Sequence, residues 1–436
     1  MDGRGCLLDQ SSRRMRLPSA GARPRLVMGR KGRFAAVAGC LLMGCTPFAP
    51  ESLEKADFLT RAQTRQGDGL QVSVAALSPA ESRRYLGEDL AGRGVQPVWL
   101  RIENQNDFPV RYLPVWTDPS YFSPSEVAFM FHHFLGSGDN QRIDEYFFKT
   151  ALDGFVPPKS SASGFVFAHA SEGTKYVNVA LFSDRKLTQF RVVVPVPGGK
   201  WDFQRVDFKN LYPAGKVVDL DLPGLKAALE ALPCCVTNKE GTRWGDPLNL
   251  VVIGNPPHMV FPFVERGWHL TEPFDLAASR KAAMAFVFGE AYESSPVSPL
   301  YVFGRPQDFA LQKIRNKISQ RNHLRGWLAP FTYQGQRVWV GQISRDIGVR
   351  LTTKSWYLTT HKIDPEVDAD RNYLLQDLAA SGFVHAIGAV GGVGAAPITA
   401  PRGNLTGDPY FTDGRRLVVF LGNEPAGFDQ MEFVKW

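Results

Sequence analysis

Short runs of alternating hydrophobic and polar positions dominate the first half of the chain. Six of them carry β-branched or aromatic residues and end at Gly, Pro, Asn or Asp, which is typical of strands. They are LQVSVAAL, QPVWLRIENQ, PVRYLPVW, SGFVFAHA, KYVNVALF and TQFRVVVPVP. We therefore predict an antiparallel β-sandwich, immunoglobulin-like in outline, over residues 67–215.

Two features of this region depart from simple alternation. The stretch RIENQNDFPVRYLP predicts two strands joined by a tight Asn-Asp turn. Between the third and fourth strands, SPSEVAFMFHHF opens with Ser and Pro, which is a helix start, and NQRIDEYFFKTAL continues the helical pattern. The sandwich is thus expected to carry a helical insertion.

The second half of the chain mixes strand and helix patterns without a strict alternation. Strands are predicted for LNLVVIG, SPLYVFGR, RNHLRGWLAPF, RVWVGQIS, VHAIGAV and RRLVVFLG. Helices are predicted for HMVFPFVERGWH, PQDFALQKI and PEVDADRNYLLQDLAAS. This mixture predicts an α+β domain with a mixed sheet over residues 216–436, so the fold class is multidomain.

The N-terminal residues have the layout of an export signal. MGRKGR, which starts at Met28, is basic, and the apolar run FAAVAGCLLMG is shorter than the about 20 residues that span a bilayer. The run ends in LMGC and resembles a bacterial lipobox, which implies that Cys45 is acylated. Thr46 in place of Asp then favours the outer membrane, facing the periplasm. The alternatives are a cleaved secretory signal and a membrane anchor with an incidental cysteine.

This interpretation divides the N-terminus into a leader, residues 1–44, and a polar tether, residues 45–66. The 27 residues before Met28 are rich in Arg and make an unusually long basic region, so we interpret Met28 as the true start. No other stretch is long and apolar enough for a transmembrane helix. Attachment to the membrane is therefore expected through the lipid.

Composition narrows the function only a little. The 436 residues are 44% hydrophobic and 21% charged, as in folded proteins. Much of the net charge of +7 lies near the N-terminus, so no nucleic-acid partner is implied. Of the five cysteines, Cys234 and Cys235 remain beyond the lipobox, and they are adjacent. Neighbouring cysteines bridge only with strain, so we favour two free thiols at a helix end over a vicinal disulfide.

Six motifs follow one another between about residue 230 and the C-terminus. They are ALPCCVTN with GDPLNLVVIG, SPVSPLYVFGRPQDFALQK, QRNHLRGWL, VWVGQISRDIGV, HKIDPEVDADRNYLLQDL and GDPYFTDGR. Together they resemble the LssY C-terminal domain family. The resemblance implies no activity and transfers no catalytic residue, so the candidate sites rest on residue chemistry alone.

The motif RNHLRGW carries the first candidate site. Side chains alternate along a strand, so Arg321, His323 and Arg325 are expected on one face. Two guanidiniums beside an imidazole suit a phosphate or a carboxylate ligand. The alternative is that an aspartate of the domain itself, Asp308, Asp364 or Asp368, neutralises them.

Two further motifs hold candidates. In GRPQDFALQK, Arg305 is a candidate for lining a binding cleft. The alternative is an ordinary surface charge at a strand-to-helix connection. In HKIDPEVDADR we predict a helix start with Asp364 as N-cap, and a solvated Asp370. His361, Asp364, Asp368 and Arg371 of this stretch are candidates only if RNHLRGW lies beside them. The glycine-rich GAVGGVGAAP is interpreted as a flexible loop, since it lacks a nucleotide-binding pattern.

The sequence thus predicts an envelope lipoprotein, attached to the membrane by its lipid, that binds a partner protein or an anionic envelope molecule. No cofactor and no metal are expected. The alternative is an envelope hydrolase acting on a phosphate ester of a lipid or glycan. In that case His323 or His361 is the acid/base and Asp364 or Asp368 a metal ligand or orienting group. Arg321, Arg325 and Arg371 would then clamp the anion.

Overall fold

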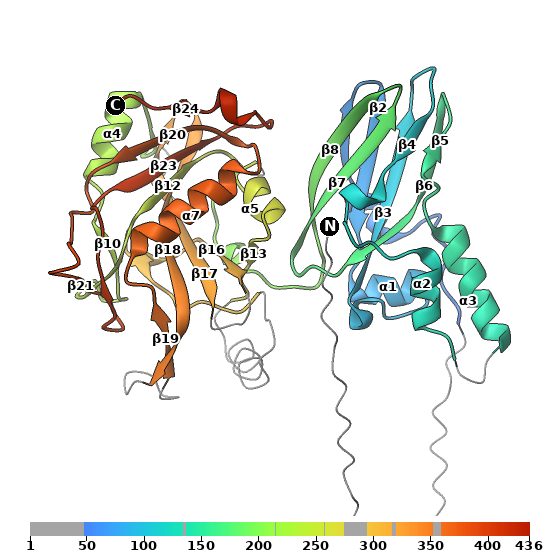
Figure 1. Ribbon diagram of the computed structural model, residues 1–436, viewed down its shortest axis with the longest axis horizontal. Coiled ribbons are helices and arrows are strands. Elements are labelled where there is room, and N and C mark those ends of the chain that lie inside the picture. The colour runs from blue at the N-terminus through green and yellow to red at the C-terminus, as the bar shows by residue number, and fades with distance from the viewer. Residues whose placement is uncertain are drawn as a thin grey trace, which may run out of the picture. The chain divides into compact units, whose positions relative to one another are not determined.

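The structure, a computed structural model, describes part of the 436-residue chain (Figure 1). The described residues are 48–133, 137–213, 215–256, 258–273, 294–315, 320–351 and 359–436. Cys45 and the rest of the predicted leader lie outside them. Most of the regular structure in these ranges is β-strand, in several antiparallel sheets and one mixed sheet.

The N-terminal body contains two four-stranded antiparallel sheets. The first comprises β1 (Gln63–Gly67), β2 (Leu70–Ala76), β3 (Val95–Asn104) and β6 (Ser160–His169). The second comprises β5 (Phe155–Val156), β4 (Val110–Tyr112), β7 (Thr174–Ser183) and β8 (Lys186–Pro195). Alternate residues of both sheets, among them Val72, Leu100, Val179 and Val192, share one hydrophobic core. The predicted antiparallel strands are confirmed.

The predicted hairpin across RIENQNDFPVRYLP is wrong. Its two strands belong to different sheets, because β3 pairs with β2 and β6 whereas β4 pairs with β5 and β7. The Asn104 amide donates to the carbonyl oxygens of Phe108 and Pro157, at 2.8 and 3.0 Å. These bonds turn the chain from one sheet into the other.

Three helices pack beside these sheets. They are α1 (Pro79–Leu86), α2 (Pro124–Met130) and α3 (Ser137–Thr150). α2 and α3 confirm the predicted insertion, and a capping box of Ser123 and Glu126 starts α2. α1 was not predicted, although Ser78 and Glu81 form the same capping box there. No helix within the described ranges is long and apolar enough to cross a membrane.

The described part of the predicted tether is folded. Phe48, Ala56 and Phe58 are 6%, 2% and 0% exposed and join a second hydrophobic core under the three helices. The short 3-10 helix Asp57–Arg61 and strand β1 follow. Isolated aromatic residues in a polar stretch produce no hydrophobic periodicity. The packing of Phe48 and Phe58 could therefore not be predicted from the sequence pattern.

The C-terminal body is built on a ten-stranded mixed sheet, counted over the described residues. Its strands are β9 (Val218–Leu220), β12 (Leu250–Ile253), β13 (His269–Leu270), β16 (Phe309–Ile314), β17 (Arg321–Tyr333), β18 (Gln336–Leu351), β19 (Thr359–Ile363), β20 (Val384–Val390), β23 (Arg416–Leu421) and β24 (Glu432–Phe433). β12 runs parallel to β23, whereas β16, β17 and β18 are antiparallel neighbours. The predicted mixed sheet is confirmed.

Two smaller sheets flank this one. They contain β10 (Cys235–Thr237), β11 (Trp244–Pro247), β14 (Tyr301–Val302) and β15 (Arg305–Pro306), and then β21 (Arg402–Gly403) and β22 (Pro409–Tyr410). The helix predicted for PQDFALQKI is wrong, because β15 and β16 occupy it. β16 pairs with β13 on one side and β17 on the other, and this pairing overrides its helix-favouring residues.

Both faces of the large sheet are buried. On one face, Leu374 and Leu378 of helix α7 (Val367–Ala379) pack with Leu324 and Ile343. On the other face, helix α4 (Leu222–Glu230) supplies Leu225 and Leu229 to a core with Trp327 and Val340. The short helix α5 (Phe261–Glu265) adds Phe263 to the core on the α7 face. Successive side chains of β17 point to opposite faces, so Leu324 faces α7 whereas Trp327 faces α4.

The start of α7 differs from the prediction. The N-cap is Glu366 and not Asp364, so the helix begins at Val367. Asp364 instead accepts a hydrogen bond at 3.0 Å from the Glu366 backbone, which makes a turn before the helix. Asp370, expected in solvent, is 1% exposed because it lies on the side of α7 that packs on the sheet.

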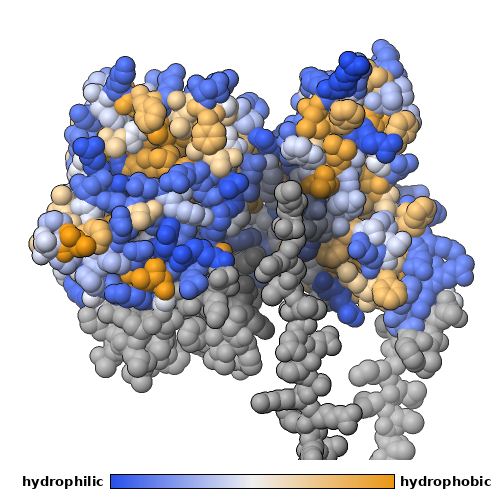
Figure 2. All heavy atoms as spheres, in the orientation of Figure 1, coloured by the Kyte–Doolittle hydropathy of each residue, from blue (hydrophilic) through white to orange (hydrophobic). Residues whose placement is uncertain are grey.

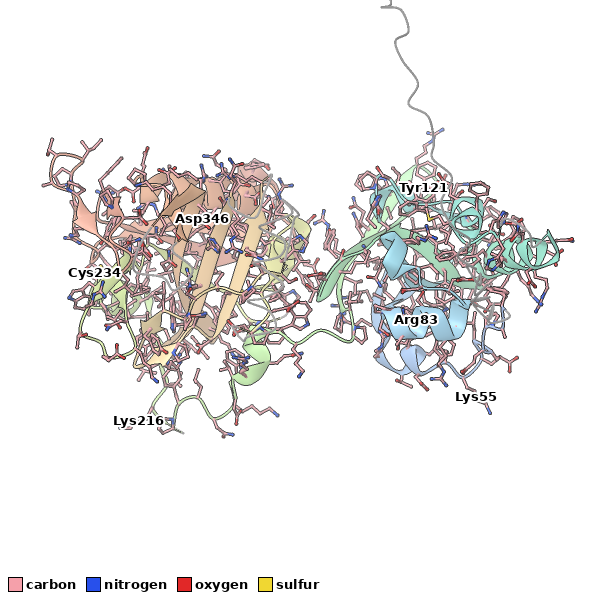
Figure 3. All side chains as sticks on the ribbon, turned by 90° about the horizontal axis from the view of Figure 1, so that it is seen from below. Lys55, Arg83, Tyr121, Lys216, Cys234 and Asp346 are labelled. Carbon is pink, nitrogen blue, oxygen red and sulfur yellow. A yellow bond between two sulfur atoms is a disulfide. The ribbon has the colours of Figure 1, made fainter. Side chains whose placement is uncertain are left out.

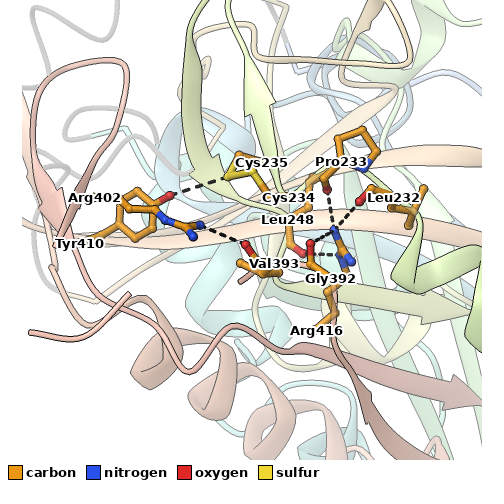
Figure 4. Close-up of a disulfide and its surroundings, with 10 residues drawn as sticks. All are labelled: Leu232, Pro233, Cys234, Cys235, Leu248, Gly392, Val393, Arg402, Tyr410 and Arg416. Carbon is orange, nitrogen blue, oxygen red and sulfur yellow. Dashed lines mark hydrogen bonds between the residues drawn. A yellow bond between two sulfur atoms is a disulfide. The ribbon is translucent and has the colours of Figure 1, made fainter. Parts of the chain in front are cut away.

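Cys234 and Cys235 are joined by a disulfide, contrary to the expectation of free thiols (Figure 4). They follow α4, and the Cys235 sulfur lies 3.7 Å from the Tyr410 hydroxyl. Beside them, the buried Arg416 donates to backbone carbonyls of Leu232 and Leu248, at 3.1 and 2.9 Å (Figure 4).

The glycine-rich loop GAVGGVGAAP is shaped by Arg416. The carbonyl oxygens of Gly391 and Gly392 accept hydrogen bonds from its guanidinium. Gly392 has a φ of 103°, and a side chain there would collide with the Arg416 guanidinium. Residues 388–390 of this stretch belong to β20, and the glycines that follow hydrogen-bond to the buried Arg416 guanidinium.

Candidate functional site

Strand β17 brings Arg321, His323 and Arg325 onto one face of the large sheet, the face opposite α7. His323 pairs across the strands with Gln312 on β16 and Ser344 on β18. All of these side chains are buried, and His323 is 5% exposed. The alternation along the strand had predicted this shared face, and Trp327 continues the row into the hydrophobic core.

His323 and Asp346 form a close pair in this row. The His323 Nε2 atom lies 2.6 Å from Asp346 Oδ2. Asp346 lies on β18 and is labelled in Figure 3. Burial lowers the pKa of His323 to about 4, so the ring is neutral at pH 7. An ionised carboxylate only accepts hydrogen bonds, so Nε2 carries the proton and Nδ1 a free lone pair. Nδ1 is buried and has no hydrogen-bond partner in the described part of the chain.

The two arginines of the row differ in how they are neutralised. Arg321 lies 3.5 Å from Asp346 and donates to Gln312 at 2.9 Å. Arg325 donates to the Ser298 carbonyl at 3.2 Å and to Gln342 Oε1 at 2.9 Å, both uncharged oxygens. Within the described ranges no ion pair joins Arg325 to a carboxylate. Burial lowers the pKa of Arg325 to about 10.

Polar groups around Arg325 leave further hydrogen-bonding capacity. The Nε2 atom of Gln342 is a buried donor without a partner in the described part. Asp246, from β11, is held by the Asn404 amide at 3.0 Å, and burial raises its pKa. We call Arg321, His323, Arg325, Gln342 and Asp346 the β17–β18 polar cluster. It offers guanidinium and amide donors together with one imidazole acceptor.

Arg305, another predicted anion ligand, is already neutralised. Its Nε and Nη2 atoms each lie 2.9 Å from an oxygen of Asp308, and Nη2 also donates to the Leu328 carbonyl. Its guanidinium lies between the rings of Tyr212 and Phe303. Beside Arg305 is a cavity of about 500 Å³, lined also by Asp202, Arg205, Asp207, Asn210, Tyr301 and Gln307. Arg305 thus shapes a cavity wall.

The candidates from HKIDPEVDADR do not join the β17–β18 polar cluster. Arg371 makes two 2.9 Å bonds to Asp413, and Asp368 accepts from the Thr412 hydroxyl at 2.8 Å. Asp364 is engaged in the turn before α7. These residues begin the helix on the opposite face of the sheet, which separates them from His323. His361 is on β19, and its side chain lies outside the described residues.

The acid that pairs with His323 was missed from sequence. Asp308, Asp364 and Asp368 were considered as neutralising groups, whereas the structure places Asp346 there. The signal was present in GQISRD, where Gln342, Ser344 and Asp346 alternate with Ile343 and Arg345. The predicted strand ended at Ser344, two residues before the aspartate.

A second pair, the buried Asp370 and the partly buried Arg345, lies on the α7 face of the sheet. The atoms Asp370 Oδ1 and Arg345 Nη2 are 3.3 Å apart, and burial raises the pKa of Asp370 to about 7. In the unfolded chain this pKa is 3.8. Between these values the unfolded chain releases a proton that the folded chain retains. The free energy of unfolding therefore falls as pH rises from about 4 to about 7.

We expect Asp370→Asn to remove that fall, because an amide does not titrate. Urea denaturation of both proteins between pH 4 and pH 8 measures it. The difference between variant and wild type isolates Asp370 from His323, whose lowered pKa acts in the opposite direction over part of this range. A difference that stays constant with pH would contradict the raised pKa.

Comparison with known proteins identifies a family for the region that holds this cluster. Residues 227–415 match the family model described as LssY C-terminus. The resemblance inferred from the motifs is confirmed, and the match includes β16, β17, β18 and α7. No curated protein matches the chain.

Proposed function

We propose that this protein is a lipid-anchored protein of a bacterial envelope whose C-terminal domain binds an anionic group at the β17–β18 polar cluster. One observation carries the proposal: Arg325 is 9% exposed, and its direct partners are uncharged oxygens. A buried charge that makes no ion pair costs several kcal/mol, and Asp246 and Asp346 act on Arg325 only through longer-range attraction. A bound anion would offset that cost.

The donors and acceptors of the cluster favour a particular kind of anion. A guanidinium fork matches the two oxygens of a carboxylate or phosphate. The Gln342 amide supplies a further donor, and the neutral His323 Nδ1 needs a hydrogen from the ligand. A phosphate that keeps one hydroxyl satisfies both needs. We therefore favour a phosphate or a phosphate monoester over a simple carboxylate.

Thermal unfolding in the presence of single anions tests this proposal. A ligand at 100 times its dissociation constant stabilises the folded state by about 2.7 kcal/mol. We expect inorganic phosphate to raise the unfolding temperature of the wild-type protein and acetate to raise it less. Arg325→Met should show no shift with phosphate. Equal shifts in both proteins would mean a general salt effect and would reject the site.

The envelope location rests on the N-terminal motif. The basic MGRKGR, the apolar run and LMGC support acylation at Cys45. We expect Cys45→Ser to abolish incorporation of radiolabelled palmitate in bacteria that express the protein. Continued labelling of the variant would reject the anchor. We also propose that the two sheets of the N-terminal body, which share one hydrophobic core, form an immunoglobulin-like sandwich.

A phosphate-ester hydrolase is the second candidate, and the His323–Asp346 pair favours it. A carboxylate that holds one ring nitrogen and leaves the other as a lone pair is the arrangement of a general base. Binding is preferred because it requires only the donors and the acceptor of the cluster, whereas hydrolysis also requires an attacking nucleophile. Release of p-nitrophenol from its phosphate, lost in His323→Ala with stability retained, would establish hydrolysis instead.

A further inference from the structure

Two exposed phenylalanines mark the helix pair α2–α3. Phe129 on α2 is 73% exposed and Phe148 on α3 is 77% exposed. The Phe129 ring lies 5.3 Å from the His132 ring, and His132 bonds Asp144 at 2.9 Å. Asp144 and Phe148 are four positions apart and so lie on one side of α3. The two phenylalanines therefore border one continuous strip of surface.

Helix α3 also contacts Phe48, the first residue that the structure describes. Phe48 is 6% exposed, and its ring packs edge-on against Tyr146 with centroids 5.5 Å apart. Its carbonyl accepts a bond from Arg142 at 3.1 Å. Three peptide links separate Phe48 from Cys45. An extended chain of this length reaches about 11 Å at most.

A lipid on Cys45 would therefore hold α3 within a short distance of the bilayer surface. No long flexible linker intervenes, because Phe48 is already fixed to Tyr146 and Arg142. Helix α3, which holds Phe48, and helix α2, which packs in the same core, would then lie near the lipid headgroups. The exposed phenylalanines of α2 and α3 lie on these elements.

We propose that the α2–α3 pair is the membrane-facing surface of this protein, and that Phe129 and Phe148 enter the headgroup region. The proposal rests on the proposed acylation of Cys45. Aromatic and aliphatic side chains on one side of a helix are what binds such interfaces. In the space-filling view, hydrophobic side chains lie among hydrophilic ones on the surface of the N-terminal body (Figure 2).

Electrostatics adds little to this contact. Helix α3 carries Arg142 and Lys149, but it also carries Asp139, Asp144 and Glu145. A mixed surface of this kind is not drawn to anionic lipid. The contact is therefore expected to be insensitive to salt and to form on uncharged phosphatidylcholine, in contrast to a basic membrane-binding patch.

Spin labels on the acylated protein in phosphatidylcholine vesicles test the proposal. Labels are attached at Phe129→Cys and Phe148→Cys, with Phe182→Cys as a control at another exposed phenylalanine (48% exposed). The joined Cys234 and Cys235 do not react with a thiol reagent. Collision rates with oxygen, which concentrates in lipid, and with a water-soluble nickel complex are then compared for each label.

We expect the ratio of oxygen to nickel collisions to be several-fold higher at 129 and 148 than at 182, with the same ratios in high salt. Palmitate labelling of the same preparation establishes the anchor separately. If Cys45 is acylated and both labels are in water, the membrane-facing surface is rejected and the anchor stands. Labels shielded from both agents would indicate a protein partner and also reject it. Absence of acylation would reject both.

Discussion

Arg416→Met is expected to destabilise the C-terminal domain by at least about 4 kcal/mol, because hydrogen bonds to a charged donor contribute about 1.5–3 kcal/mol each. Arg416 is completely buried. Its guanidinium donates to six backbone carbonyls: those of Leu229, Leu232, Pro233, Leu248, Gly391 and Gly392. A thioether replaces none of these donors, so the six carbonyls would lose these hydrogen bonds.

Urea denaturation of the variant measures this loss. Arg415→Met is the matched control, since Arg415 is the adjacent residue and is exposed. We expect the control to remain within about 0.5 kcal/mol of the wild-type protein. Similar unfolding free energies for the two variants would show that Arg416 does not hold the glycine-rich loop and the end of α4 together.

Arg305→Met and Arg325→Met are expected to have very different effects on the ligand-free protein. Arg305 neutralises Asp308, which is 1% exposed, so its removal leaves a buried carboxylate unpaired. Breaking a buried pair in this way costs about 3–5 kcal/mol. Arg325 has only uncharged direct partners and is compensated only by the more distant Asp246 and Asp346, so its replacement breaks no ion pair. We expect a change within about 1 kcal/mol there, of either sign.

Chemical denaturation in a buffer without phosphate or sulfate measures both variants. The comparison is internal, since both changes remove a largely buried arginine of the same domain and insert the same side chain. If Arg325→Met destabilises as much as Arg305→Met, the domain itself compensates Arg325. The reason to expect a bound anion would then disappear.

The hydrophobic pattern of the sequence predicted strands and helices well where the alternation of side chains matches the burial of the strand. The strand containing Arg321, His323 and Arg325 was predicted together with its shared face, because side chains alternate in any paired strand. The helical segment after Asp364 was also predicted, with an error of two residues at its start.

The contacts between distant elements could not be predicted from local sequence pattern. Which face of the sheet α7 covers depends on the whole topology, and this separates Arg371 and Asp368 from His323. Asp346 was missed because the predicted strand ended too early. PQDFALQKI is a strand only because two neighbouring strands pair with it. The sequence therefore suggested the cations of the site but not their counter-charges.

Isothermal titration with inorganic phosphate tests the central proposal most directly. The wild-type protein, Arg325→Met and Arg415→Met are titrated under identical conditions. We expect one saturable site in the wild type and in Arg415→Met, and an affinity at least about tenfold weaker in Arg325→Met, as for loss of a charged hydrogen bond. Equal affinity in all three proteins, or no binding to the wild type, would contradict an anion site at the β17–β18 polar cluster.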